Sequence, residues 1–123
     1  MSERGPLEFL SDIIEAMRRI NTYIAEMNYS EFLMDLKTRD AVIRNLEVIG
    51  EAAKSIKDDF RQRFPDVPWR EMSGVRDKLI HHYFGVNFEI VWKIVRDELP
   101  GEAIKIHSIL NEISPEIGDN KTP

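Results

Sequence analysis

The chain has 123 residues, of which 42% are hydrophobic and 32% are charged, a balance typical of a single folded domain. Its 17 Lys and Arg residues against 22 Asp and Glu residues give a net charge of −5, which excludes an overall basic coat for nucleic acid but not a local basic patch. It contains no cysteine, which excludes disulfides, thiolate metal sites and cysteine nucleophiles. No apolar stretch is long enough for a membrane span or a secretory signal, so we expect a cytoplasmic protein with no membrane partner.

Near the start of the chain, apolar residues recur at steps of three and four, which predicts one amphipathic helix. This stripe consists of Leu7, Leu10, Ile13, Ile14, Met17, Ile20, Ile24 and Met27. Pro6 suits the first turn of such a helix, because the N–H that proline lacks has no partner there in any case. After a break at Asn28-Tyr29-Ser30, Ser30 is a candidate N-cap for a short helical turn over Glu31 to Leu36.

A heptad-like seam predicts a second long helix that packs against another helix. The seam consists of Val42, Leu46, Ile49, Ala53, Ile56 and Phe60. Gly50 and Ala53 are small, so a partner helix can approach closely there, at a cost of about 0.5–1 kcal/mol for Gly in a helix interior. Ile43 and Gly50 make the apolar band wider than a monomer needs, which favours a symmetric homodimer. The prolines of Phe64-Pro65-Asp66-Val67-Pro68 end this helix.

The rest of the chain also has helical spacing. Pro68 can open a third helix, carrying Trp69, Met72, Val75, Leu79 and Tyr83. Asn87 can cap a fourth helix, with the apolar residues Phe88, Val91, Trp92, Val95 and Leu99. Pro100-Gly101 is expected to kink or break that helix, and a last stripe follows at Ile106, Ile109, Leu110 and Ile113.

Together these elements predict an all-α fold, an antiparallel bundle of four or five helices in a single domain over residues 1–123. Residues 114–123 contain two prolines and a glycine and show no apolar periodicity, so we expect a disordered tail. No period-two alternation, internal repeat or low-complexity segment is visible.

The densest group of functional side chains is the stretch from Arg76 to Tyr83. Arginine binds phosphate oxygens with a bidentate fork, and histidine moves protons near neutral pH, so the group suits phosphodiester chemistry. A charged helix end that packs through Leu79 and Tyr83 explains the same residues. On an uninterrupted helix Arg76 and Tyr83 fall nearly on one line, whereas His81 lies about 140° from Arg76. Either the helix ends or bends near His81, or a second chain completes the site.

These residues carry a resemblance to a known family. Arg76 and His81 with four residues between them, then one residue and Tyr83, match the R-x4-H-x-Y motif of HepT-like proteins, in the HEPN superfamily (higher eukaryotes and prokaryotes nucleotide-binding). Residues 39–53 resemble the second helix of the family, and Pro68-Trp69-Arg70-Glu71-Met72 leading into Arg76 is also similar. The resemblance covers roughly residues 7–113, nearly the whole chain.

The resemblance implies an all-helical homodimer that acts as a toxin, a metal-independent endoribonuclease with no cofactor. Its antitoxin partner would be a minimal nucleotidyltransferase (MNT), which silences the toxin by attaching AMP to the motif tyrosine, here Tyr83. Arg76 and His81 would be the catalytic pair at the dimer cleft, and Asp77 would support them. The 2′-hydroxyl of RNA can attack its own phosphodiester, with His81 as general acid or base and Arg76 stabilising the added charge.

Other interpretations stay open. The same cleft can belong to a non-catalytic module that binds a nucleotide or the nucleotidyltransferase, or to a purely structural dimer. His107 is interpreted as a structural residue, and His82 is given no role. Between Lys37 and Lys78 there are ten basic and eight acidic residues, an excess that fits modest, salt-dependent RNA binding and also a solvated mixed-charge face.

Overall fold

The computed structural model describes residues 4–79 and 85–113. These residues form helices joined by turns, so the expected all-α class is confirmed. The elements are α1 (Pro6–Ile24), α2 (Tyr29–Met34), α3 (Leu36–Ser55), α4 (Asp58–Arg63), α5 (Trp69–Ser73), α6 (Val75–Leu79), α7 (Phe88–Lys93), the π-helical segment η1 (Ile94–Glu98) and α8 (Leu99–Ile113). The tail 114–123 lies outside the described residues.

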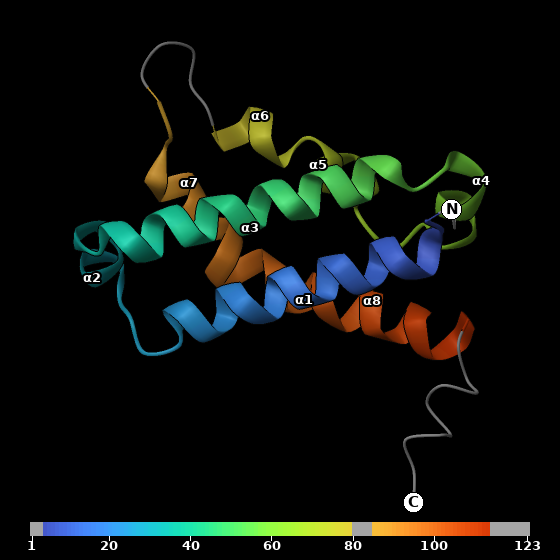
Figure 1. Ribbon diagram of the computed structural model, residues 1–123, viewed down its shortest axis with the longest axis horizontal. Coiled ribbons are helices and arrows are strands. Elements are labelled where there is room, and N and C mark those ends of the chain that lie inside the picture. Colours follow the sequence, from blue (N-terminus) through green and yellow to red (C-terminus); the bar gives the residue numbers. More distant parts are fainter. Residues whose placement is uncertain (1–3, 80–84, 114–123) are drawn as a thin grey trace, which may run out of the picture.

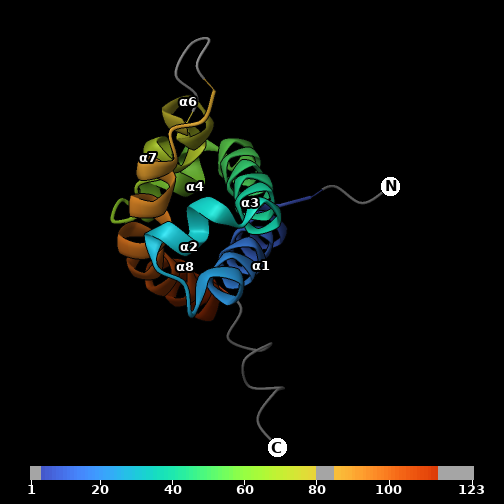
Figure 2. The same ribbon diagram turned by 90° about the vertical axis from the view of Figure 1, so that its left-hand side faces the viewer.

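Two long helices, α1 and α3, lie side by side and antiparallel, and α8 packs along α1 (Figures 1 and 2). The predicted stripe of α1 turns inward, and its buried members include Leu10, Ile13, Met17, Ile20 and Ile24. Pro6 opens the helix as expected, and the side chain of Glu8 accepts a hydrogen bond of 2.7 Å from the N–H of Gly5. The core therefore lies between long helices whose apolar faces the sequence predicts.

Helix α2 lies across one end of the bundle (Figure 2). Phe32 is fully buried there, with its ring centroid 5.1 Å from that of Trp92. The predicted cap, Ser30, is wrong: Asn28 caps the helix, accepting from the N–H of Glu31 at 2.9 Å, while the Glu31 carboxylate accepts from the N–H of Asn28. This reciprocal pair needs an acid three residues after the cap, which Asn28 has and Ser30 lacks.

The second long helix ends earlier than the seam predicts. Ile56 has an extended backbone, with ψ of 127°, so α3 stops at Ser55 and Phe60 belongs to the separate helix α4. The guanidinium of Arg61 donates to the carbonyls of Ala53 (2.6 Å) and Ile56 (3.0 Å). The carbonyl of Ala53 also accepts from the N–H of Ile56 at 3.2 Å, so Arg61 adds to the hydrogen bonds that end α3.

The helix expected after Pro68 is divided into α5 and α6 by Gly74, which leaves helical geometry with ψ of 11°. Just before it, the hydroxyl of Ser73 donates to the carbonyl of Trp69 at 2.8 Å, a local bond that competes with helix continuation. The part of this predicted helix that includes His81 and Tyr83 lies outside the described residues.

Pro100 bends the last helical region without ending it. The N–H of Leu99 bonds to the carbonyl of Ile94, five residues back, so η1 is a π-helical turn that joins α7 to α8. A proline has no N–H and its ring crowds the carbonyl four residues earlier, and the wider π turn relieves this conflict. As a result α7 and α8 run in different directions (Figure 1).

The close approach expected at Gly50 is present, but the helices that make it belong to the same chain. A Cβ atom added to Gly50 would lie 3.2 Å from Cγ1 of Val75 and 3.5 Å from the carbonyl oxygen of Met72. Gly50 is therefore covered by α5 and α6, and its use as a sign of a wider dimer face is wrong. The homodimer itself stays a prediction.

Candidate functional site

Arg76 projects from α6 beside the middle of α3. Its side chain is 67% exposed, and its Nε atom lies 3.7 Å from a carboxylate oxygen of Glu47 on α3. Asp77, the next residue, is also exposed. The predicted cation is thus accessible to a ligand and is held near one acidic neighbour by a loose ion pair.

A groove of about 340 Å³ surrounds Arg76 between α3 and α6. It is lined by Arg44, Glu47, Gly50, Glu51, Lys54, Ser73, Arg76 and Asp77. Three cations and three acids face this space, so basic charge is present at fixed positions without a net excess. The small positive excess that the sequence shows between residues 37 and 78 is therefore not concentrated here. We call this space the motif groove.

The structure fixes where the chain leaves α6 and where it returns. The N–H of Asn87 donates to the carbonyl of Leu79 at 2.8 Å, and Leu79 is buried. In one straight helix these two residues would be about 12 Å apart along the axis. The segment that contains His81 and Tyr83, which themselves lie outside the described residues, therefore begins and ends beside α6.

Asn87 also starts α7, as predicted. Its side-chain oxygen accepts from the N–H groups of Glu89 (3.1 Å) and Ile90 (3.2 Å). Gly85, two residues earlier, has φ of +81°, a left-handed conformation that glycine adopts without strain. Asn87 thus caps α7 through its side chain, and its backbone N–H bonds to Leu79 across residues 80–86, which we call the motif segment.

A second group of charges lies on the other side of α6 and was not anticipated. A small cavity of about 20 Å³ is bordered by the charged residues Glu71, Lys78, Glu98 and Glu102. Burial first, and then the nearby carboxylate of Glu98, raise the pKa of Glu102 to about 7 against the opposing effect of Lys105 and Lys78. The sequence signal for this site is a pair of acidic residues one helical turn apart, Glu98 and Glu102, on either side of Leu99-Pro100-Gly101.

The remaining candidates are placed without a part in the motif groove. His107 is exposed on α8, beside a groove of about 310 Å³ that Met17 and Leu99 also line. Among residues 4–79 and 85–113, no three His, Asp or Glu side chains are grouped so as to hold a metal ion. Within the same residues, no helix combines the length and apolar character that a bilayer crossing requires.

The HEPN resemblance implies a helical domain with an arginine, a histidine and a tyrosine close together in the chain. The structure shows such a helical domain, with the arginine exposed in a charged groove. The sequence model described as Ribonuclease HepT-like matches residues 13–109. The chain therefore belongs to the HepT-like ribonuclease family, which confirms the predicted family.

Several named proteins are similar to this chain over most of its length. A Methanocaldococcus jannaschii protein named "Putative RNase MJ0127" is 47% identical over 116 residues, which cover 94% of this chain and 96% of the relative. "Probable ribonuclease HepT" of Thermococcus cleftensis is 48% identical over 98 residues, covering 80% and 89%. "Putative RNase TTE0752" of Caldanaerobacter subterraneus is 36% identical over 109 residues, covering 89% and 97%. No solved structure matches the chain.

Proposed function

We propose that this chain is a metal-independent endoribonuclease in which Arg76 and His81 are the catalytic pair and Asp77 supports them. The observation that carries the proposal is the exposed Arg76 in the motif groove, next to the point where the segment containing His81 begins and ends. Membership of the HepT-like ribonuclease family supports the same activity.

The proposed reaction is attack by the 2′-oxygen of a ribose on the adjacent phosphorus. The 2′-oxygen loses its proton to a base and bonds to phosphorus. The bond from phosphorus to the 5′-oxygen then breaks, and an acid gives that oxygen a proton. The products are a 2′,3′-cyclic phosphate and a 5′-hydroxyl, and no metal-bound water is needed. His81 serves as acid or base, a role typically worth about 10²–10⁴-fold in rate.

Arg76 has the chemistry to stabilise the five-coordinate transition state, whose non-bridging phosphate oxygens carry the added negative charge. Its ion pair with Glu47 is loose at 3.7 Å, so a phosphate can compete for the guanidinium without breaking a short hydrogen bond. Two acids besides Glu47 line the groove, which keeps non-specific attraction for RNA modest. The groove is therefore suited to placing one phosphate for reaction more than to holding a long strand.

The proposal extends to assembly and control. Two copies form a symmetric homodimer, in which facing motifs build one cleft. The protein acts in the cytoplasm as the toxin of a pair with a minimal nucleotidyltransferase antitoxin, which silences it by adenylylating Tyr83. Attaching AMP there adds bulk and negative charge where the substrate phosphate has to bind.

The activity is tested by incubating the purified chain with RNA in EDTA. We expect cleavage by the wild type, and losses of at least about 100-fold in Arg76→Ala and His81→Ala. Arg70→Ala and His107→Ala are matched controls, because both residues are exposed and lie outside the motif groove. Undiminished cleavage by both motif variants would contradict the proposal. RNA binding without turnover by the wild type would favour the non-catalytic module instead.

Control through Tyr83 is tested separately. Co-expression with a minimal nucleotidyltransferase, followed by intact mass measurement, should show AMP-sized additions that Tyr83→Phe abolishes. An unchanged mass beside a demonstrably active transferase would contradict this part of the proposal and leave the ribonuclease activity standing.

A further inference from the structure

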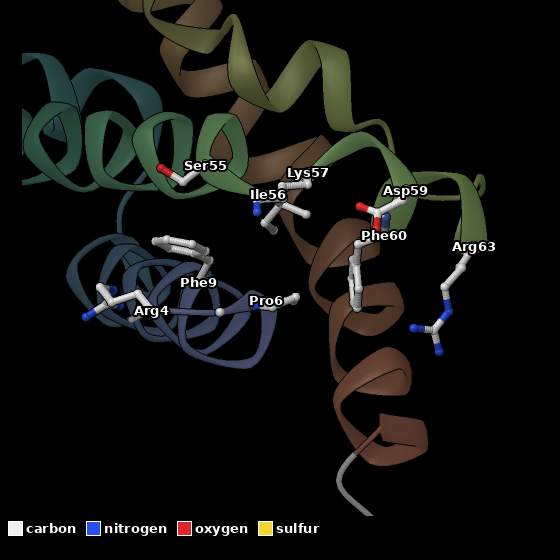
Figure 3. A pocket seen from close by; sticks show the side chains of 10 residues that line it. Arg4, Pro6, Phe9, Ser55, Ile56, Lys57, Asp59, Phe60 and Arg63 are labelled. Atoms are coloured by element: carbon white, nitrogen blue, oxygen red, sulfur yellow. The ribbon is translucent and has the colours of Figure 1, made fainter. Parts of the chain in front are cut away.

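A second hollow lies at the far end of α3, outside the motif. This pocket, of about 470 Å³, is formed by the start of α1, the end of α3 and the short helix α4 (Figure 3). Its lining includes the rings of Phe9 and Phe60 and the cations Arg4, Lys57 and Arg63. Figure 3 shows the two rings between Arg4 at one end and Arg63 at the other. We call it the α4 pocket.

The cations of the α4 pocket differ in how far they are already neutralised. Arg4 forms an ion pair with Asp12. Lys57 and Arg63 are exposed, and within residues 4–79 and 85–113 neither forms an ion pair with an acid. Among the residues that the structure describes, Asp59 is the one acid that lines the pocket, and its carboxylate accepts from the N–H of Phe60 at 2.9 Å. Two positive charges are thus available to an anion.

The rings give the α4 pocket an apolar side as well. Phe9 is half-buried, with one face of its ring toward the guanidinium of Arg4 at 5.3 Å. The guanidinium of Arg63 lies 5.5 Å from the ring of Phe60. Aromatic rings and guanidinium planes are the two surfaces on which proteins stack unpaired bases, and nearby Lys and Arg hold the phosphates. The pocket has the size range of a small-ligand site.

The α4 pocket and the motif groove are separate, and their linings come within one residue of each other along α3. Lys54 lines the groove and Ser55, the next residue, lines the pocket. From Glu47, which pairs with Arg76, to Ser55 the helix rises about 12 Å. That length corresponds to roughly three to four stacked nucleotides at about 3.4 Å each. A single strand placed at Arg76 can therefore reach the pocket within a few nucleotides.

We infer that the α4 pocket is a binding site for a nucleotide of single-stranded RNA a few positions from the scissile phosphate, with Lys57 and Arg63 on its phosphates and Phe9 against its base. The inference rests on the proposed function for the position of the cut, while its binding test does not need cleavage. The pocket supplies the affinity that the mixed charge of the motif groove does not.

The test measures binding of a single-stranded, 2′-O-methylated RNA of about 12 nucleotides, which cannot react through its 2′-oxygens, by fluorescence anisotropy at about 50 and 200 mM salt. We expect Lys57→Gln/Arg63→Gln to weaken binding by about 5- to 20-fold and to reduce the salt slope by about 1.4, the value for two lost phosphate contacts. The control Lys37→Gln/Lys93→Gln removes the same charge from exposed sites outside both pockets. It should change binding by less than about twofold.

Two further measurements compare binding of the strand with binding of a free nucleotide, and the contribution of the base with that of the phosphate. AMP should bind far more weakly than the oligonucleotide. Phe9→Leu, which keeps an apolar side chain, should weaken oligonucleotide binding at least about threefold with an unchanged melting temperature. Equal binding by the two double variants, equal affinity for AMP and the strand, or no binding by the wild type at low salt would each overturn the inference.

Cleavage gives an independent readout. With an unmodified strand of the same length, the Lys57→Gln/Arg63→Gln variant should raise KM and leave kcat unchanged, while a trinucleotide substrate should be cut equally by both proteins. If the wild type binds the strand through the pocket but cuts no RNA, the proposed function fails and the binding site stands. If the wild type cuts RNA but the variant binds and cuts equally well, the binding site fails alone.

Discussion

The two sides of α3 are built differently. On one side α1 packs against it as a regular helix of 19 residues, through apolar side chains that are almost fully buried (Figure 1). On the other side lie α5 and α6, five residues each, divided by Gly74 and packed closely over Gly50. Charged groups border this second side, in the motif groove and around Glu102.

This difference separates stability from chemistry. Long apolar contacts stabilise a fold without requiring exact placement of individual atoms, because the hydrophobic effect is not directional. A site for phosphate needs charged side chains at fixed positions near water, which short helices and a close backbone contact can provide. We therefore expect substitutions of the buried residues between α1 and α3 to change the free energy of unfolding, and substitutions in the motif groove to change cleavage.

The largest stability effect is expected on the α1 side. Ile20 is 1% exposed, and Ile20→Ala should lower the free energy of unfolding by about 2–5 kcal/mol through lost burial and a cavity. Urea denaturation measures this, with the exposed neighbour Asn21→Ala as the control. Cleavage per folded molecule should stay at the wild-type value. A selective loss of cleavage in folded Ile20→Ala would show that the two sides are not separate.

Glu102 provides a pH-dependent test of the other side. Because its folded pKa is raised to about 7, the folded state binds its proton more tightly than the unfolded state does. The protonated carboxyl contributes its full stabilisation below about pH 4.5, and this stabilisation is lost as the pH rises through about 7. Above that pH the carboxylate is charged and half-buried, which destabilises the fold. Glu102→Gln should therefore stabilise the fold by roughly 1–3 kcal/mol at about pH 8, and by little at about pH 4.5.

Urea denaturation at the two pH values measures this difference, with Glu112→Gln, an exposed residue of the same helix, as the control. Equal effects of Glu102→Gln at both pH values would show that the carboxylate is not penalised by the fold. Such a result would show that a charge at Glu102 destabilises the fold no more than a charge on the open surface does.

The fold on the α1 side could be predicted from sequence almost completely. The stripe through Ile13 and Ile20 and the seam through Leu46 and Ile49 depend on periodicity alone, and all four residues are buried. The division at Ile56 could not be predicted, because it depends on Arg61 reaching back to α3 through space. The π-helical segment before Pro100 could not be predicted either. The missing N–H of proline and its crowding of an earlier carbonyl are compatible with a kinked helix and with a broken one.

The candidate site was predicted only in part. The motif predicts that Arg76 is a functional cation, a role that stays a prediction, and the structure places Arg76 in an exposed position. Its neighbour Glu47 lies 29 positions earlier in the chain. No local sequence pattern indicates that α6 packs beside this particular residue of α3. The assignments of His81 and Tyr83 stay predictions.

Two asparagine caps allow the comparison to be sharpened at smaller scale. Asn28 caps α2 at the end of the bundle, and Asn87 caps α7 where the motif segment returns to α6. Each Asn→Ala variant should cost about 1 kcal/mol of stability, measured by urea denaturation. We expect Asn87→Ala alone to reduce cleavage as well, and Asn87→Asp, which keeps an accepting oxygen, to restore it. Equal cleavage by both alanine variants would show that the activity of the motif does not depend on the cap of α7.

The smallest stability effect is expected at Gly50, where two contributions oppose each other. Replacing a glycine inside a helix by alanine gains about 0.5–1 kcal/mol, but the new Cβ would lie 3.2 Å from Val75 on α6. Crowding offsets the gain, so the free energy of unfolding of Gly50→Ala should stay within about 1 kcal/mol of the wild type. Because Val75 and Arg76 are adjacent, the same shift should move Arg76 and reduce cleavage several-fold.

Gly101→Ala is the matched control, since nothing lies within 4 Å of its added Cβ. That variant should gain about 0.5–1 kcal/mol and keep full cleavage. Wild-type cleavage by Gly50→Ala would mean that α6 tolerates displacement, and that the close contact at Gly50 serves packing alone. A loss of cleavage at nearly constant stability would instead tie the position of Arg76 to a single backbone contact on α3.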